Sequence, residues 1–186
     1  MSFIRLFVPF FLILDMSFIR DIQTRLFTVY RKFKKFPNKP HNPVSLEQAK
    51  KIGILFNAED VKDNDSILAF SEKLKSSNKD VQLLGFIDHR EFGNPYPFPF
   101  FTAKDLSWFG KPAGGTCGYF MHFPFDLLIT FTKSENQPLD YISASSSAKL
   151  RVGFFSADNT SDYDIVFLPS QNKITHCINS IETYLK

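Results

Sequence analysis

The chain has 186 residues, of which 44% are hydrophobic and 22% are charged, a composition that fits one globular domain with an appendage and excludes wholesale disorder. The formal net charge of +3 is unevenly distributed, because residues 1–36 hold seven Lys and Arg against two Asp while the rest of the chain is slightly acidic. The body therefore lacks a basic excess that could neutralise phosphates, and no nucleic acid is expected as a partner.

Residues 1–15 are predicted to be an upstream extension. The pentapeptide MSFIR begins at Met1 and recurs at Met16, which indicates that translation starts at Met16; the alternative is a short membrane-touching tail. The apolar run in this segment is shorter than the ~20 residues that span a bilayer. No small-residue cleavage motif follows it, so a signal peptide is not predicted.

Residues 16–36 are predicted to form a basic amphipathic helix. Apolar residues recur in it at spacings of three and four; they are Ile19, Ile22, Leu26, Val29, Tyr30 and Phe33. The candidates for binding an anionic membrane surface or an acidic protein partner are Arg31, Lys32, Lys34 and Lys35. The alternative is a helix that packs its apolar face on its own domain. A Pro-rich linker is predicted over 37–44.

Residues 45–186 are predicted to form one domain with five short, largely apolar strands. These strands are expected over 51–57, 80–87, 126–132, 150–155 and 163–168. A helix that starts at Asn64 or Asp65 should follow the first strand, because both residue types favour the N-cap position. Another helix is predicted at the end of the chain, over 174–185.

The segment from Phe125 to Phe154 decides the fold class. It contains a buried strand, a polar loop, a helix that starts near Pro138, and a second strand. Small residues over 143–148 let this helix lie close to a sheet. Strand, helix and strand at this spacing form a βαβ unit with parallel strands. We therefore expect a three-layer, Rossmann-like α/β domain with a mostly parallel sheet of about five strands.

Two stretches rich in Gly and Pro are predicted to be loops. Residues 93–101 (GNPYPFPFF) alternate proline with aromatic residues, so they are unsuited to a central strand and should fold back over the core. Residues 110–118 (GKPAGGTCG) look superficially like a phosphate-binding loop. They lack the Gly-Lys-Ser/Thr ending, and a strand rather than a helix is expected next.

Neither a metal nor a cofactor is expected. Cys117 and Cys177 lie far apart and the four histidines are scattered, whereas a zinc site needs about four ligands in close pairs. The GxGxxG, GxSxG and HExxH motifs are missing from the sequence. The cysteine pattern favours a reducing, cytoplasmic compartment.

Topology selects the candidate ligand site, since ligands of open parallel sheets bind beyond the carboxyl ends of the strands. That rule selects the loops 57–63, 88–92, 132–137 and 156–160. Asp88 and His89 are the best acid–base pair in them, because His titrates near neutral pH. Asp60 follows the first strand, where a base could lie. The alternative is that all three are solvated loop residues.

Two resemblances to known families are present. The stretches KIGILFN (51–57) and FTAKDLSWFG (101–110), with the segment from Phe125 to Phe154, resemble a small family of bacterial α/β proteins defined only as a domain of unknown function. FDLLI and AKLRVGF within that segment also resemble the N-terminal half of heptosyltransferase-type glycosyltransferases. That second resemblance implies a base at Asp60, although Glu59 stands where those enzymes have Gly, and their nucleotide-sugar donor domain has no counterpart here.

The favoured function is a non-catalytic binding or scaffold module that is peripheral to the inner membrane face. The alternative is a glycosyltransferase-like half-domain that binds a sugar or nucleotide ligand. A stand-alone enzyme is less favoured, because no set of nucleophile, base and orienting residue can be assembled from the sequence.

Overall fold

The computed structural model describes residues 22, 25, 26, 28–30, 44–59, 61–88, 96–133, 136–154, 162–168 and 173–186. Six of the candidate site residues lie outside the described residues; these are Arg31, Lys32, Lys34, Lys35, Asp60 and His89. Residues 1–21 and most of the Pro-rich linker lie outside them as well.

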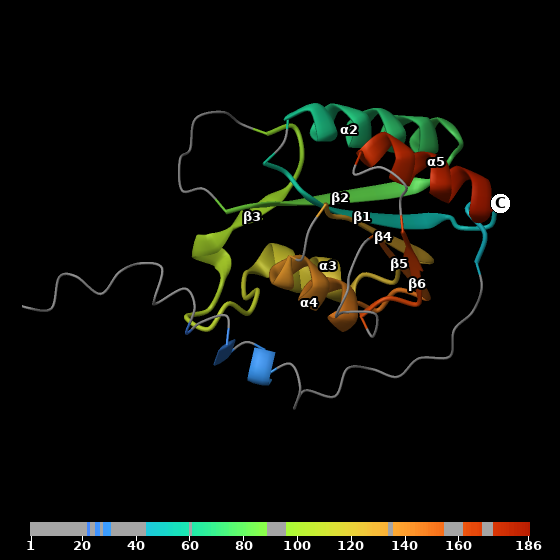
Figure 1. Cartoon of the computed structure of the whole chain (residues 1–186). Coiled ribbons are helices and arrows are strands. Elements are labelled where there is room, and N and C mark those ends of the chain that lie inside the picture. Colours follow the sequence, from blue (N-terminus) through green and yellow to red (C-terminus); the bar gives the residue numbers. More distant parts are fainter. Residues whose placement is uncertain are drawn as a thin grey trace, which may run out of the picture.

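A parallel sheet forms the middle layer of the domain (Figure 1). In the described part of the chain it has six strands: β1 (Lys51–Asn57), β2 (Asp80–Ile87), β3 (Phe100–Thr102), β4 (Leu127–Phe131), β5 (Leu150–Phe154) and β6 (Ile165–Phe167). Their order is β3-β2-β1-β4-β5-β6, and every neighbouring pair is parallel. This is the strand order of the Rossmann fold. The predicted α/β class is confirmed, with one strand more than expected.

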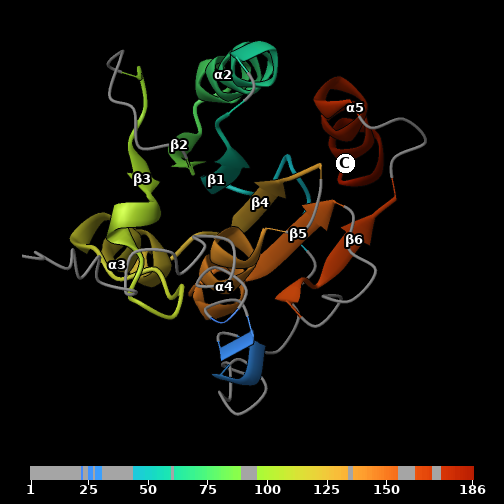
Figure 2. The ribbon, with the colours of Figure 1, turned by 60° about the vertical axis from the view of Figure 1, so that its left-hand side comes forward.

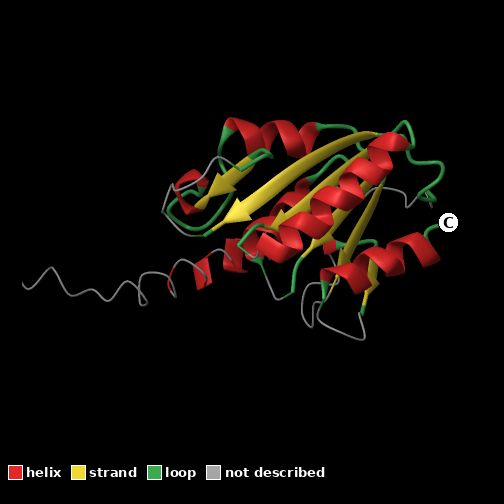
Figure 3. Ribbon diagram, turned by 90° about the horizontal axis from the view of Figure 1, so that it is seen from above, coloured by secondary structure: helices red, strands yellow, loops and turns green. Residues whose placement is uncertain are grey.

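Helices cover both faces of the sheet (Figures 1 and 2). One face carries α2 (Val61–Ser76) and α5 (Ile174–Tyr184), and the other carries α3 (Gly115–His122) and α4 (Gln137–Ser145). Seen from above, the helices run along the strands (Figure 3). In β1, Ile54 and Phe56 belong to the core under α2 and α5, whereas Leu55 belongs to the core under α3 and α4. Strands buried on both faces account for the almost wholly apolar β1.

The predicted βαβ unit is confirmed by β4, α4 and β5. Leu127 of β4 pairs with Leu150 of β5 in parallel register. Pro138 lies in the first turn of α4, and the Asn136 side chain caps the helix by accepting the N–H of Leu139 at 3.2 Å. Ser143 and Ala144 in the last turn of α4 are buried, as a helix lying close to a sheet requires.

The extra strand, β3, lies where the sequence predicted a loop. Its three residues pair with the end of β2 at the edge of the sheet, and the last proline of the stretch immediately precedes them. An edge position tolerates prolines nearby, because one side of the strand needs no donors. Phe98 is buried against Phe56, with ring centroids 4.8 Å apart, so the expected folding back over the core is confirmed for the described residues 96–101.

Helix α3 corrects the interpretation of the Gly-rich stretch at 110–118. A strand was expected after it, but Gly115–His122 is helical because Cys117 and Phe120 bury one side against the sheet. Packing outweighs the low helix propensity of glycine here. The loop is nevertheless unsuited to phosphate, since the Asp105 carboxylate lies beside Gly114 at the start of the helix.

Helix α2 begins at Val61, earlier than the predicted start at Asn64 or Asp65. Asn64 is a buried residue of the first turn, and its amide donates a hydrogen bond to the carbonyl of Ala58 at 2.9 Å. The polar run from Glu59 to Asp65 offers several N-cap candidates, and the sequence alone does not distinguish them.

Asp126 joins three adjacent strands at their amino-terminal ends. One carboxylate oxygen accepts the backbone N–H groups of Lys50 and Lys51, at 2.9 and 3.0 Å, and the other lies 2.8 Å from the Lys149 ammonium. Burial alone would raise the pKa of this carboxyl, but Lys149 and the two N–H donors lower it from 3.8 to about 2. The charged form of Asp126 therefore stabilises the fold.

Replacing Asp126 with Asn should lower the free energy of unfolding at neutral pH by about 2 kcal/mol, the equivalent of a pKa lowered from 3.8 to about 2. Because the folded-state pKa is the lower one, this contribution is complete above pH ~4 and disappears as the pH falls towards ~2. Urea unfolding of both proteins along an acid pH series measures it. Asp80→Asn, at the exposed start of β2, is the matched control. A stability difference that stays constant down to pH ~2 would contradict the assignment.

Candidate functional site

A cleft of about 350 Å³ opens beyond the carboxyl ends of β1 and β4. We call it the switch-point cleft, because the strand order reverses between these two strands and such crevices are where open α/β sheets bind ligands. Its lining consists of Asn57, Glu59, Val61, Asp63, Phe131, Thr132, Lys133 and Ile174. Phe131 and Ile174 are buried and make an apolar floor, and the polar side chains stand around it.

Glu59 organises one rim of the cleft. The Asn57 side chain accepts the backbone N–H of Glu59 at 3.3 Å, and its amide donates to a Glu59 carboxylate oxygen at 3.4 Å. The other Glu59 oxygen accepts the N–H of Asp88, which follows β2, at 3.3 Å. Side chains of the protein itself thus engage two backbone N–H groups at the strand ends.

An ion pair forms the opposite side. The Lys133 ammonium lies 2.5 Å from a carboxylate oxygen of Asp63, so the loop after β4 is joined to the first turn of α2. The hydroxyl of Thr132 donates to the carbonyl of Phe154 at 3.3 Å. Among the described lining residues, Glu59 is therefore the carboxylate that no basic side chain of the cleft neutralises.

The two cysteines offer no reactive thiolate to this region. Burial, followed by the nearby Asp63 carboxylate, raises the pKa of Cys177, on α5, to about 11. Burial, followed by the Asp105 carboxylate, raises the pKa of Cys117 to about 12. Both thiols are free and stay protonated at neutral pH. In the described part of the chain, no group of His, Cys, Asp and Glu is arranged to hold a metal ion.

Comparison with known proteins places the chain in a family. The model of a family of unknown function, DUF6913, matches residues 25–186. The chain belongs to this family. No curated protein matches it. The resemblance to a family of unknown function is thereby confirmed, whereas neither comparison supports the resemblance to heptosyltransferases.

Only one of the predicted site residues of this DUF6913 protein is described. Asp88 follows β2 directly and is half-buried, and its N–H binds Glu59 at the rim of the switch-point cleft. Two of the four loops selected by topology, those after β1 and β4, line the cleft. The roles predicted for Asp60 and His89 stay predictions, because both lie outside the described residues.

Sequence reasoning missed Glu59 and the Asp63–Lys133 pair. The sequence assigned Glu59 no role beyond standing where the glycosyltransferases have Gly, and it indicated no role for Lys133. Opposite charges in the loops after two strands would have been a usable signal if the strands were known to be neighbours. That knowledge comes from the strand order, in which β1 and β4 are adjacent although far apart in sequence.

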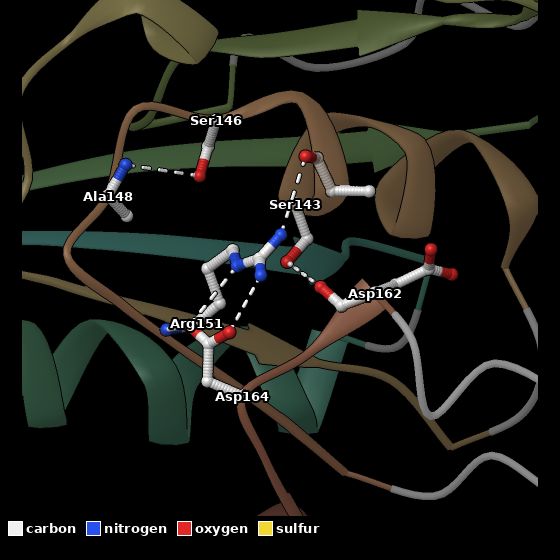
Figure 4. A network of polar contacts seen from close by, with 7 residues as sticks. Ser143, Ser146, Ala148, Arg151, Asp162 and Asp164 are labelled. Carbon is white, nitrogen blue, oxygen red and sulfur yellow. Dashed lines mark hydrogen bonds and ion pairs between the residues drawn. The ribbon is translucent and has the colours of Figure 1, made fainter. Parts of the chain in front are cut away.

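A polar network joins α4 to β5 and to the residues that precede β6 (Figure 4). The Arg151 guanidinium binds both oxygens of Asp164, at 3.2 and 2.6 Å, and also approaches the carbonyl of Ala144 at 3.4 Å. Ser143 donates to the carbonyl of Asp162 at 3.4 Å. The side chains of Arg151 and Asp164 are 12% and 3% exposed, and such a bidentate pair fixes the geometry of the segments that it joins. This network serves the fold rather than the cleft.

Tyr163 joins the same region to the first turn of α4. Its hydroxyl donates to the buried carboxyl of Asp140 at 2.5 Å, and burial, followed by the Asp140 charge, raises its pKa well above 10. Its ring lies directly over Gly153 of β5, where a Cβ atom would come within 2.6 Å of ring carbons. Glycine at this position is what lets the tyrosine ring lie against the strand.

Replacing Tyr163 with Phe should lower the free energy of unfolding by about 1–3 kcal/mol, because the buried Asp140 carboxyl loses a close donor while the ring packing is kept. Urea unfolding at neutral pH measures this difference. Tyr184→Phe, on an exposed tyrosine of α5, is the matched control and should change stability by less than about 0.5 kcal/mol. Equal effects of the two substitutions would contradict a specific Tyr163–Asp140 interaction.

A second candidate surface lies at the N-terminal end of the described chain. Residues 22, 25, 26 and 28–30 are helical, and we refer to them as the N-terminal helix residues. Tyr30 contacts the domain: its ring lies 5.4 Å from that of Phe109, and its hydroxyl lies 3.5 Å from that of Tyr141 on α4. Ile22, Leu26 and Val29 are exposed. In the described residues, no helix is both long and apolar enough to cross a membrane.

Proposed function

We propose that this DUF6913 protein is a non-catalytic binding module that takes a small polar ligand into the switch-point cleft. The observation that carries the proposal is the position of the cleft beyond β1 and β4, at the reversal of a Rossmann strand order. An apolar floor with a few polar groups around it is the usual composition of a small-molecule site.

The arrangement of Glu59 favours an uncharged or cationic ligand over a phosphorylated one. Rossmann domains bind phosphate through free backbone N–H groups after the first strand. In this protein the N–H of Glu59 is engaged by Asn57, and the N–H of Asp88 is engaged by the Glu59 carboxylate. A negative charge thus stands where an anion would have to bind. Hydroxyl and amine donors of a ligand, in contrast, suit the remaining lone pairs of this carboxylate.

The described lining also favours binding over catalysis. The Asp63 carboxylate and the Lys133 ammonium neutralise each other, and the hydroxyl of Thr132 is directed to a backbone carbonyl. None of the described lining residues is paired as a nucleophile with a base. The cleft therefore supports binding of a ligand without catalysis. In this proposal, the non-catalytic module predicted from the sequence acts by binding that ligand.

A thermal-shift screen of the full chain tests the proposal, with unphosphorylated sugars, polyols and amines compared with their phosphorylated counterparts. A ligand at 100 times its Kd stabilises the folded state by about 2.7 kcal/mol. We expect stabilisation by an unphosphorylated compound, and its loss in Asn57→Ala and Glu59→Gln. Glu72→Gln, on the exposed side of α2, is the matched control and should keep the shift. Stabilisation that survives the Asn57 and Glu59 substitutions would place the ligand elsewhere, and a preference for phosphorylated compounds would contradict the role of Glu59.

A second candidate function is attachment to an anionic membrane surface at the cytoplasmic face, with an acidic protein partner as the alternative. Its support is the exposure of Ile22, Leu26 and Val29 on the N-terminal helix residues, together with the basic charge of the surrounding sequence. The helix packs on its own domain through Tyr30 while these three side chains stay exposed. Tyr30 thus supports packing of the helix on its own domain, and the three exposed apolar side chains support contact with a membrane or partner.

Replacing Arg31, Lys32, Lys34 and Lys35 with Gln should release the protein from anionic vesicles. Each basic residue near such a surface contributes about 1 kcal/mol, so the loss of all four should lower partitioning by about a thousandfold. Co-sedimentation with vesicles of phosphatidylglycerol and phosphatidylcholine measures it. The matched control removes the same charge from the exposed residues Lys50, Lys62, Lys75 and Lys186. Equal losses in both variants would show that net charge, and not the N-terminal segment, causes binding.

A further inference from the structure

The turn that carries Trp108 is held in one conformation by hydrogen bonds. The N–H of Gly110 donates to the carbonyl of Ser107 at 2.8 Å, and the N–H of Ser107 donates to the carbonyl of Lys111 at 2.8 Å. The hydroxyl of Ser107 accepts the N–H of Lys111 at 3.0 Å. Gly110 has φ 88°, a left-handed conformation that favours glycine. These bonds hold the turn closed, so the position of its tip is defined.

Trp108 stands at that tip with 69% of its surface exposed. Tryptophan is highly buried on average, because its large apolar ring gains from leaving water. This turn instead presents the ring outwards, and the ring contacts Phe109 edge-on with centroids 5.6 Å apart. A defined turn that displays a large aromatic side chain marks a contact site.

A chain of aromatic contacts places this turn beside the N-terminal helix residues. Phe109 contacts Trp108 on one side and Tyr30 on the other, and Tyr30 in turn stacks on Tyr141 with centroids 6.3 Å apart. Tyr141 is 1% exposed and belongs to α4, so the chain of contacts ends in the core of the domain. The turn and the helix residues therefore belong to one face of the molecule.

The helix residues add an apolar stripe with a charge in it. Ile22, Leu26 and Val29 follow one another at spacings of four and three, and their exposed fractions are 40%, 40% and 51%. Such spacing puts them on one side of a helix. Arg25 lies between them in sequence and is also exposed. Single exposed apolar residues are ordinary, but a stripe of them beside an exposed tryptophan is not.

We propose that Trp108 and this helical stripe form a single membrane-contacting face that binds anionic lipid. The proposal rests on the second candidate function above and adds a second contact to it, in a loop more than 70 residues further along the chain. Charge complementarity favours anionic lipid as the binding partner, because residues 17–36 carry six Lys and Arg against one Asp. Tryptophan favours the membrane–water interface, where its ring is apolar and its N–H is hydrated.

Trp108 is the chain's single tryptophan, so its fluorescence reports on this face alone. The full chain is titrated with phosphatidylcholine vesicles with and without phosphatidylglycerol, and with the same vesicles carrying brominated acyl chains. We expect a shift of the emission to shorter wavelength and quenching by the brominated chains with anionic vesicles only. Trp108→Ala should lower the partition coefficient measured by co-sedimentation about tenfold. Tyr184→Ala, an exposed aromatic residue on α5 at the other face of the sheet, should leave it unchanged.

The possible outcomes separate this inference from the helix attachment. Co-sedimentation with anionic vesicles while the Trp108 emission stays unchanged would overturn the inference and leave the helix attachment standing. No co-sedimentation at all would overturn both. An emission shift caused by polyglutamate but not by vesicles would replace the membrane with an acidic protein partner. Fluorescence and co-sedimentation of the unsubstituted protein together decide each case, so the result does not depend on the folding of a variant.

Discussion

Parallel pairing of β1 with β4 is the constraint on which the rest of the structure depends. It joins segments that are remote in sequence, since Asp126 and Lys50, at the starts of these strands, are 76 residues apart. Closing so long a loop costs conformational entropy that local interactions do not recover. Asp126 offsets part of this cost, because its carboxylate accepts hydrogen bonds from three donors. The same pairing reverses the strand order and so creates the switch-point cleft at the opposite ends of the strands.

The elements that could be predicted from the sequence are those with strong local signals. Strand β1 is a short apolar run, and Pro138 with the small residues after it indicated α4. Strand β3 was not predicted, because its three residues form a strand by pairing with β2 and carry no strand pattern of their own. Helix α3 was not predicted, because its glycines have a low helix propensity. Burial of Phe120 nevertheless stabilises the helix.

The candidate site could be predicted only to the level of loops. The rule for parallel sheets selected the segments after β1 and β4, and both line the cleft. The roles of the side chains within these loops could not be predicted, because the ion pair of Asp63 with Lys133 depends on which strands are neighbours. The role of Glu59 depends on a hydrogen bond to the end of β2, and no pattern in the sequence encodes that distance.

The two faces of the sheet divide the proposed activities between them. The floor of the switch-point cleft, Phe131 and Ile174, belongs to the core under α2 and α5, whereas Tyr30 rests on α4 at the other face. A molecule lying on lipid through Tyr30's side of the sheet would keep the cleft on its far side, open to water. Ligand exchange and membrane residence would then not compete, and each could vary in the cell without the other.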